Sequence, residues 1–124
     1  MRRSDQRRAA VFALYAREVR GETADEGIDE AKPFTRELIA GVEEHRAELD
    51  AEIAGLARGW QLDRIAPLEK SIMRVGLYEL RHREDIPVEV AIDEAVGLAR
   101  RYCGADAPGF VNGILAAAAR GERR

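Results

Sequence analysis

The spacing of apolar residues predicts α-helices along the whole chain and no confident strand. Apolar positions recur at steps of three and four, which is the period of an amphipathic helix, and they do not alternate as in a strand. A first helix is predicted from Ser4, as its cap, to Gly21, and residues 21–32 are predicted to form a loop or short helix. The apolar stripe of this first helix consists of Val11, Phe12, Leu14, Tyr15, Ala16 and Val19.

Three prolines mark the beginnings of later helices, because proline is well tolerated in the first turn. Pro33 opens a long predicted helix that ends near Gly59 and has His45 on its apolar face. Pro67 opens a segment that is apolar on most of its circumference, so this helix is expected to be central and buried. Pro87 opens the next helix, and a final one follows over residues 110–118. Five to seven helices with short connections predict an all-α fold of packed antiparallel helices.

The composition fits one domain that spans residues 1–124. Apolar residues make up 46% and charged residues 35%, and no apolar run is long enough for a membrane span, so a cytoplasmic protein is expected. Cys103 is the single cysteine and excludes an intramolecular disulfide. Together with His45 and His82 it cannot supply a four-ligand structural zinc site, so no structural metal and no cofactor are expected.

Positive charge gathers at the N-terminus of a chain whose net charge is -3. Residues 1–20 carry six arginines against Asp5 and Glu18, whereas residues 21–55 are strongly acidic. The positive end of a helix dipole disfavours cations by a few tenths of a kcal/mol each, so arginines at this position suggest an anionic ligand. Arg3 and Arg7 are four residues apart and share a helix face that is predicted to face phosphates. A solvated terminus is an equally good interpretation.

The chain lacks the motifs of the common enzyme classes. It has no phosphate loop, no dinucleotide glycine fingerprint and no His-Glu-x-x-His, and Ser71 is the only serine besides Ser4. Glu79 interrupts an apolar helix and would suit a general base, but a carboxylate tied to backbone amides or to an arginine inside the fold is favoured. We therefore predict a binding protein and no enzyme.

Three further residues have a structural and a functional interpretation. Phe110 follows Ala107-Pro108-Gly109 and would stack on a nucleobase if it were exposed, but a core position is favoured. His45 is expected to be packed and hydrogen-bonded, and Cys103 is expected to fill apolar space near a helix end.

Four segments, in this order and spacing, resemble the NusB family. They are RRAAVFALY, LIAGV, LEKSIMRVGLYELRHREDIPVEVAIDEAVGLARRY and FVNGIL, and the resemblance runs from about Arg3 to Ala118. It implies two packed three-helix bundles and a role in transcription antitermination and ribosomal RNA synthesis. It also implies binding of boxA-type RNA together with the ribosomal protein NusE, in a complex that joins elongating RNA polymerase.

The resemblance also assigns roles to individual residues. The positions implied to contact RNA are Arg2, Arg3, Arg7 and Arg8 on the first helix and Asp106 and Phe110 on the last. Tyr15 and Glu69 match positions that face the ribosomal protein. No residue is assigned to catalysis or to a metal.

This chain departs from the family pattern at several of these places. Ser4 and Asp5 interrupt what is often a denser arginine run, and Phe12 stands where glutamine is common. Gly109 stands where a basic residue often precedes the phenylalanine, and Cys103 stands where glycine is usual. The RNA affinity and sequence preference are therefore open.

Two other functions remain open from the sequence. The same helical domain resembles the N-terminal part of ribosomal RNA cytosine methyltransferases, so a detached module of such an enzyme is one alternative. A scaffold that binds only proteins, with the N-terminal arginines solvated, is the other. The resemblance to the NusB family also implies that a homodimer is an option, and the sequence does not decide the oligomeric state.

Overall fold

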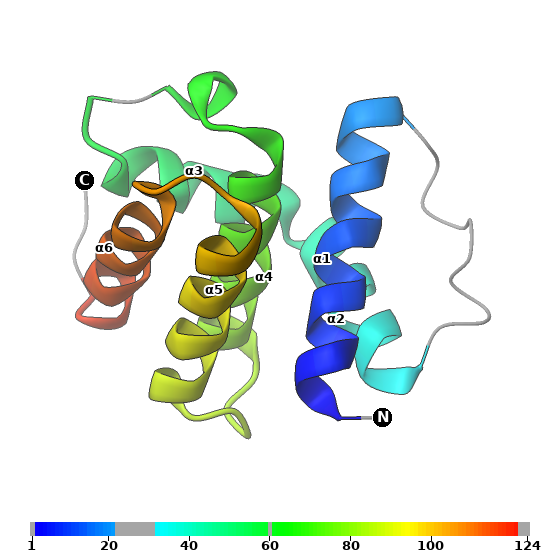
Figure 1. The fold of residues 1–124 in the computed structure, drawn as a ribbon. Coiled ribbons are helices and arrows are strands. Elements are labelled where there is room, and N and C mark those ends of the chain that lie inside the picture. Colours follow the sequence, from blue (N-terminus) through cyan, green and yellow to red (C-terminus); the bar gives the residue numbers. More distant parts are fainter. Residues whose placement is uncertain (1, 22–31, 60, 122–124) are drawn as a thin grey trace.

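The computed structural model describes residues 2–21, 32–59 and 61–121, and these residues form six α-helices and one short 3₁₀ turn (Figure 1). The elements in chain order are α1 (Arg3–Arg20), α2 (Pro33–Glu44), α3 (Arg46–Leu56), η2 (Leu62–Arg64), α4 (Pro67–His82), α5 (Val88–Tyr102) and α6 (Ala107–Ala119). The predicted all-α fold is confirmed. Most of the predicted loop at 21–32, and Trp60, lie outside the described residues.

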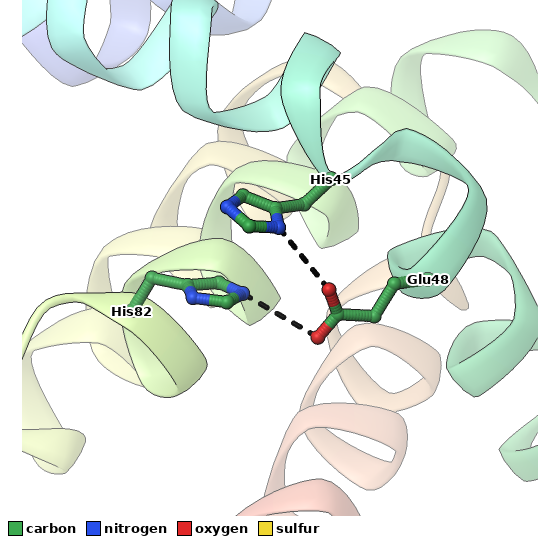
Figure 2. Close-up of side chains that lie close together, drawn as sticks. All are labelled: His45, Glu48 and His82. Carbon is green, nitrogen blue, oxygen red and sulfur yellow. Dashed lines mark hydrogen bonds and ion pairs between the residues drawn. The ribbon is translucent and has the colours of Figure 1, made fainter.

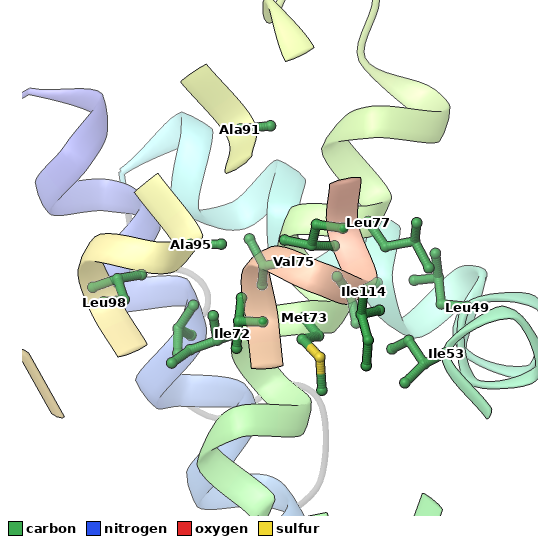
Figure 3. Packing of buried hydrophobic residues seen from close by; sticks show 14 of the residues in the cluster. Leu49, Ile53, Ile72, Met73, Val75, Leu77, Ala91, Ala95, Leu98 and Ile114 are labelled. Atoms are coloured by element: carbon green, nitrogen blue, oxygen red, sulfur yellow. The ribbon is translucent and has the colours of Figure 1, made fainter. Parts of the chain in front are cut away.

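The central helix is α4, as its apolar circumference predicts. On one side α1 and α2 pack together and against α4, and on the other α5 and α6 do the same, while α3 packs across α4 and α6 (Figure 1). All the other helices thus pack against α4. Figure 3 shows Ile72, Met73, Val75 and Leu77 of α4 between side chains of α3, α5 and α6, and all four are almost completely buried. Burial of each such side chain contributes roughly 1.5–3 kcal/mol.

Gly21 ends α1 as predicted, but Ser4 does not cap it. Gly21 has a φ of 72° and donates its N–H to the carbonyl of Arg17, which is the left-handed helix end that glycine favours. At the other end the capping position is Arg2, and the Ser4 hydroxyl donates to the Glu94 carboxylate of α5 at 2.9 Å. The cap prediction was wrong because a charged acceptor on another helix takes the hydroxyl.

The predicted long helix after Pro33 is two helices, which is a second correction. The break lies at His45, whose φ of -106° and ψ of 17° are not helical, and α3 then runs in a new direction across α4 and α6. Apolar residues keep helical spacing across the break, because both halves bury one face. The periodicity alone therefore could not locate it. α3 ends at Leu56, just before the predicted limit at Gly59, which has a φ of 81°.

A network of charged side chains joins α1, α3 and α4. The Glu18 carboxylate of α1 accepts from Lys70 at 2.6 Å and from Arg74 at 2.8 Å, both of α4, and from Arg46 of α3 at 2.8 Å. Arg74 also donates to Asp50 at 2.7 Å. Burial alone would raise the pKa of Glu18, but the hydrogen bonds and charges of Lys70 and Arg74 outweigh it and lower the pKa to about 2.

Replacing Glu18 by Gln should destabilise the protein in a pH-dependent way. The pKa in the folded protein, about 2, lies below the ordinary value of 4.5, so ionised Glu18 stabilises the fold above that value and loses this effect as the pH falls from 4.5 toward 2. Urea unfolding at neutral pH should show that Glu18→Gln costs about 2–3 kcal/mol. The difference from the parent protein should shrink as the pH is lowered through this window.

Glu44→Gln, on the exposed face of α2, provides the matched control and should change the stability by less than about 0.5 kcal/mol. A Glu18→Gln deficit of constant size from neutral to acid pH would show that the network does not act through the charge of Glu18.

Candidate nucleic-acid interface

A groove lies between the first half of α1 and the neighbouring face of α5. The two helices run in the same direction (Figure 1). Ser4 therefore meets Glu94 near one end of the groove, and Phe12 meets Tyr102 near the other. The cavity has a volume of about 230 Å³, and its lining residues are Ser4, Arg8, Asp93, Glu94, Gly97, Leu98 and Arg101. It is therefore a shallow, polar surface groove.

Three of the four N-terminal arginines are accessible to a ligand. The Arg2 side chain is exposed. Arg3 is 51% exposed, lies 4.4 Å from the centre of the Phe34 ring and reaches Asp85 only at 3.5 Å. Arg8 is 36% exposed and pairs with Asp5 one turn earlier at 3.1 Å. Such exposed pairs contribute at most about 1 kcal/mol, so a phosphate can replace the carboxylate.

Arg7 differs from the other three because it is buried. Its side chain is 4% exposed, and it donates from Nε and Nη2 to the two carboxylate oxygens of Glu79, both at 2.7 Å. Nη1 also lies 3.4 Å from Glu94. The expectation that Arg3 and Arg7 present their guanidinium groups together is wrong, since the shared helix face turns into α4 at Arg7. The favoured interpretation of Glu79, as a carboxylate tied to an arginine inside the fold, is confirmed.

Arg7 and Glu79 each change the pKa of the other. Burial alone would lower the pKa of Arg7, but the hydrogen bonds and charge of Glu79 outweigh it and raise that pKa. Burial raises the pKa of the Glu79 carboxyl, and Arg7 acts in the opposite direction. The bidentate geometry supports two ionised partners, because a planar guanidinium matches both oxygens of a carboxylate.

Arg101 is a groove residue that the sequence interpretation missed. It is exposed in the last turn of α5 and lines the groove on the side opposite to Arg8, with its guanidinium 5.5 Å from the Tyr102 ring. Asp93 and Glu94 also line the groove, so its two sides carry both signs of charge. The sequence signal was the basic end of α5, but only the position of α1 relative to α5 places Arg101 across the groove from Arg8.

A second, larger cavity of about 420 Å³ lies at the beginnings of α4 and α6. Its lining includes Glu69 from α4, Gly104 and Asp106 from the α5–α6 connection and Phe110 from α6. The predicted RNA positions, Asp106 and Phe110, are thus brought together with Glu69, which was predicted to face a protein. Phe110 is half-buried and packs against the core. Its exposure thus lies between the exposed stacking position and the core position that the sequence allowed.

The acidic side of this cavity is partly desolvated. Burial raises the pKa of Glu69, and burial together with the charge of Glu69 raises the pKa of the Cys103 thiol. Cys103 caps the end of α5 and packs against the core, in agreement with its predicted role as apolar filler.

A row of aromatic rings lies beside the end of the groove. Phe12 lies edge-on to Tyr102 with ring centres 4.9 Å apart and edge-on to Tyr15 at 6.4 Å. Tyr102 is 39% exposed and comes just before the connection that lines the second cavity. Phe12, one of the residues that depart from the family pattern, thus lies between Tyr102 and Tyr15, the latter a predicted protein-binding position.

Among the described helices, none has both the length and the apolar character needed to cross a membrane.

Comparison with known proteins gives one consistent result. A family model described as the NusB family matches residues 4–120. The chain is 38% identical over 122 residues to the transcription antitermination protein NusB of Rubrobacter xylanophilus, with 93% of this chain and 88% of that protein covered.

Two solved structures show the same fold. NusB from T. maritima superposes with a TM-score of 0.90 at 30% identity, over 100% of this chain and 94% of that one. A crystal structure of the antitermination factors NusB and NusE in complex with double-stranded RNA gives a TM-score of 0.84 at 24% identity, with 97% of each chain covered.

Replacing Arg7 by Ala should destabilise the fold strongly. The change leaves the Glu79 carboxylate buried without its partner, which costs about 3–5 kcal/mol in free energy of unfolding, measurable by urea denaturation. Arg8→Ala, one residue further on, should cost less than about 1 kcal/mol. The double change Arg7→Met with Glu79→Leu should recover most of the loss, because it removes both charges. Equal effects of Arg7→Ala and Arg8→Ala would contradict the assigned role of the buried pair.

Proposed function

The chain belongs to the NusB family of transcription antitermination proteins, which are not enzymes, and on this basis we propose that it binds boxA-type single-stranded RNA together with NusE. The RNA contacts the groove between α1 and α5 and the cavity beside Phe110. The resulting complex joins elongating RNA polymerase and supports transcription of ribosomal RNA.

The observation that carries this proposal is the open groove with an arginine on each side. Arg8 of α1 and Arg101 of α5 both line it, and Arg2 and Arg3 continue the positive charge toward the beginning of α1. Phosphates would bind these guanidinium groups at the rim, and release of counterions would supply much of the affinity.

The carboxylates of the groove fit RNA that enters with its bases inward. Asp93 and Glu94 repel phosphates, but their oxygens accept hydrogen bonds from base amino groups such as that of cytosine. Guanidinium groups at the rim and carboxylates beside them therefore favour a single strand with splayed bases over a closed duplex.

The second cavity suits one unstacked base. Phe110 offers a half-exposed aromatic face, and the exposed Asp106 offers an acceptor next to it. Gly109 immediately precedes Phe110, but the exposed Arg64 also lines this cavity, so we propose that stacking on Phe110 and hydrogen bonding to Asp106 are accompanied by a phosphate contact from Arg64.

We propose that NusE binds beside the RNA, on a surface formed by Tyr15 and Glu69. Glu69 lines the same cavity as Phe110, and the ring of Phe12 lies next to Tyr15 and Tyr102. Val19, one turn after Tyr15 on α1, is 54% exposed and extends this surface with an apolar side chain. The solved complex of a NusB with NusE and RNA supports testing both ligands together.

The arginines of the groove can be tested by titrating labelled boxA-type RNA at several salt concentrations. If the parent protein neutralises three or four phosphates, log affinity against log salt should slope at about -2 to -3. The double change Arg8→Ala with Arg101→Ala should reduce affinity at least about tenfold and make the slope less negative by about 1.4. The matched control is Arg58→Ala with Arg120→Ala, since neither residue lines the groove or the Phe110 cavity.

Equal losses for the two double variants, or equal binding of a scrambled RNA, would reject the groove as the specific site. Capture of NusE by a protein that ignores every RNA would favour the protein-only scaffold. Sedimentation of the same samples reports whether the protein is a monomer or a homodimer.

Phe110→Leu should weaken binding of boxA-type RNA without changing the salt slope. Leucine keeps most of the apolar packing but removes the aromatic face, whose stacking on a base is worth about 1–3 kcal/mol, or roughly 5- to 150-fold in affinity. Thermal unfolding of the free variant checks that the fold is retained. An unchanged affinity, or a loss that comes with a changed salt slope, would contradict a stacking role.

A further inference from the structure

Two histidines and a glutamate meet where α2 ends and α3 begins, remote in sequence from the groove residues of α1 and α5. His45 is the residue at the helix break, Glu48 lies in the first turn of α3, and His82 is the last residue of α4 (Figure 2). His45 Nδ1 lies 3.1 Å from one oxygen of Glu48, and His82 Nε2 lies 3.4 Å from the other. The ligand atoms of all three residues lie within 4.8 Å of one another.

The two imidazole rings are stacked and both turn a nitrogen toward the same carboxylate. Their centres are 3.9 Å apart and their planes are inclined by 18°. His82 Nε2 is shielded from solvent and makes no hydrogen bond within the described part of the chain. The Glu48 oxygen at 3.4 Å is its charged neighbour but does not accept a hydrogen bond in good geometry, and a shielded ring nitrogen in this state would gain free energy from a bound ligand.

We propose that His45, Glu48 and His82 bind a divalent transition-metal ion, with zinc as the representative case. Two imidazole nitrogens and one carboxylate oxygen are a donor set that suits zinc, copper or nickel, with water in the remaining position. Magnesium and calcium prefer sites made of oxygen ligands. The sequence argument against a four-ligand structural site still holds, because this site has three protein ligands.

The side chains have room to reach coordination distance. Zinc binds imidazole nitrogen at about 2.0–2.1 Å and in the plane of the ring, so the stacked rings must rotate apart and the donors must approach to about 3–3.5 Å. The Glu48 side chain is 53% exposed, and the two histidines are each about one-quarter exposed, so these rotations do not disturb the core. Tyr78 stacks on His82 and lies against Gly41, where a Cβ would overlap its ring. His45 also stacks on Tyr78, so both imidazoles lie against the same ring, and the half-exposed Glu48 side chain is the ligand that can move most freely.

A bound ion would tie the junction of α2 and α3 to the end of α4. In its absence the contact of the two histidines with Glu48 and the stacking of their rings link these helix ends in this cluster. The ion would therefore stabilise the folded chain, since an unfolded chain does not hold these three ligands together.

The test measures zinc binding to the full chain by calorimetry, with thermal unfolding as an independent readout. We expect one zinc ion per chain, a rise of at least about 5 °C in Tm at saturation, reversal by a chelator and no rise with magnesium. His82→Gln and His45→Gln should each weaken binding at least about tenfold, whereas Cys103→Ala should bind as the parent does. Circular dichroism checks that the variants are folded.

Cobalt substitution in the unaltered chain tests the ligands without a mutation. Visible absorption bands of a four- or five-coordinate ion, without a thiolate charge-transfer band, would support coordination by imidazole and carboxylate. A thiolate band, binding that survives the double change of His45 and His82, or no saturable binding below about 100 µM zinc, which corresponds to about -5.5 kcal/mol, would overturn the proposal.

Discussion

The buried ion pair between Arg7 and Glu79 is the interaction on which the arrangement of the other helices depends. It holds α1 against α4 with two hydrogen bonds of 2.7 Å, and both side chains are almost fully removed from water. Two buried charges are costly unless they meet each other in good geometry, so few other placements of α1 would satisfy them. Because α5 also packs on α4, this placement brings α1 beside α5 and forms the groove.

Arginines on one helix therefore have different roles according to their depth. Arg3 stays half exposed against the Phe34 ring, Arg7 is enclosed and structural, and Arg8 returns to the surface beside Arg101. A count of positive charges treats these residues alike, although only the exposed ones contribute to a field that an RNA strand meets. The charges available to a ligand are fewer than the N-terminal sequence suggests.

Much of the fold was predictable from the sequence because it follows from local chemistry. The spacing of apolar residues gave the helices, the apolar circumference after Pro67 gave the central helix, and Gly21 gave the end of α1. Glu79 was identified because an acid in an apolar helix needs an internal partner.

The features that were missed all depend on tertiary contacts. The break at His45 leaves no trace in the apolar spacing, and the roles of Ser4 and Arg7 are set by carboxylates on α5 and α4. Arg8 and Arg101 line one groove, and Glu69 and Phe110 line one cavity, and this can be predicted only when it is known which helix ends are neighbours. Residue type and spacing indicated the N-terminal arginines, the family resemblance assigned Glu69 and Phe110, and only the packing of the helices shows which of these residues lie together.

The network around Glu18 has a consequence for recognition when it is considered together with the opposite end of the same helix. Charged contacts hold α1 near both ends, through Arg7 at one and Glu18 at the other. A helix anchored twice is preorganised, and it loses little conformational entropy when a ligand settles on it. A ligand that binds α1 would therefore have to match the surface as it stands, because a helix held at both ends does not change its backbone to fit a ligand of different shape or charge.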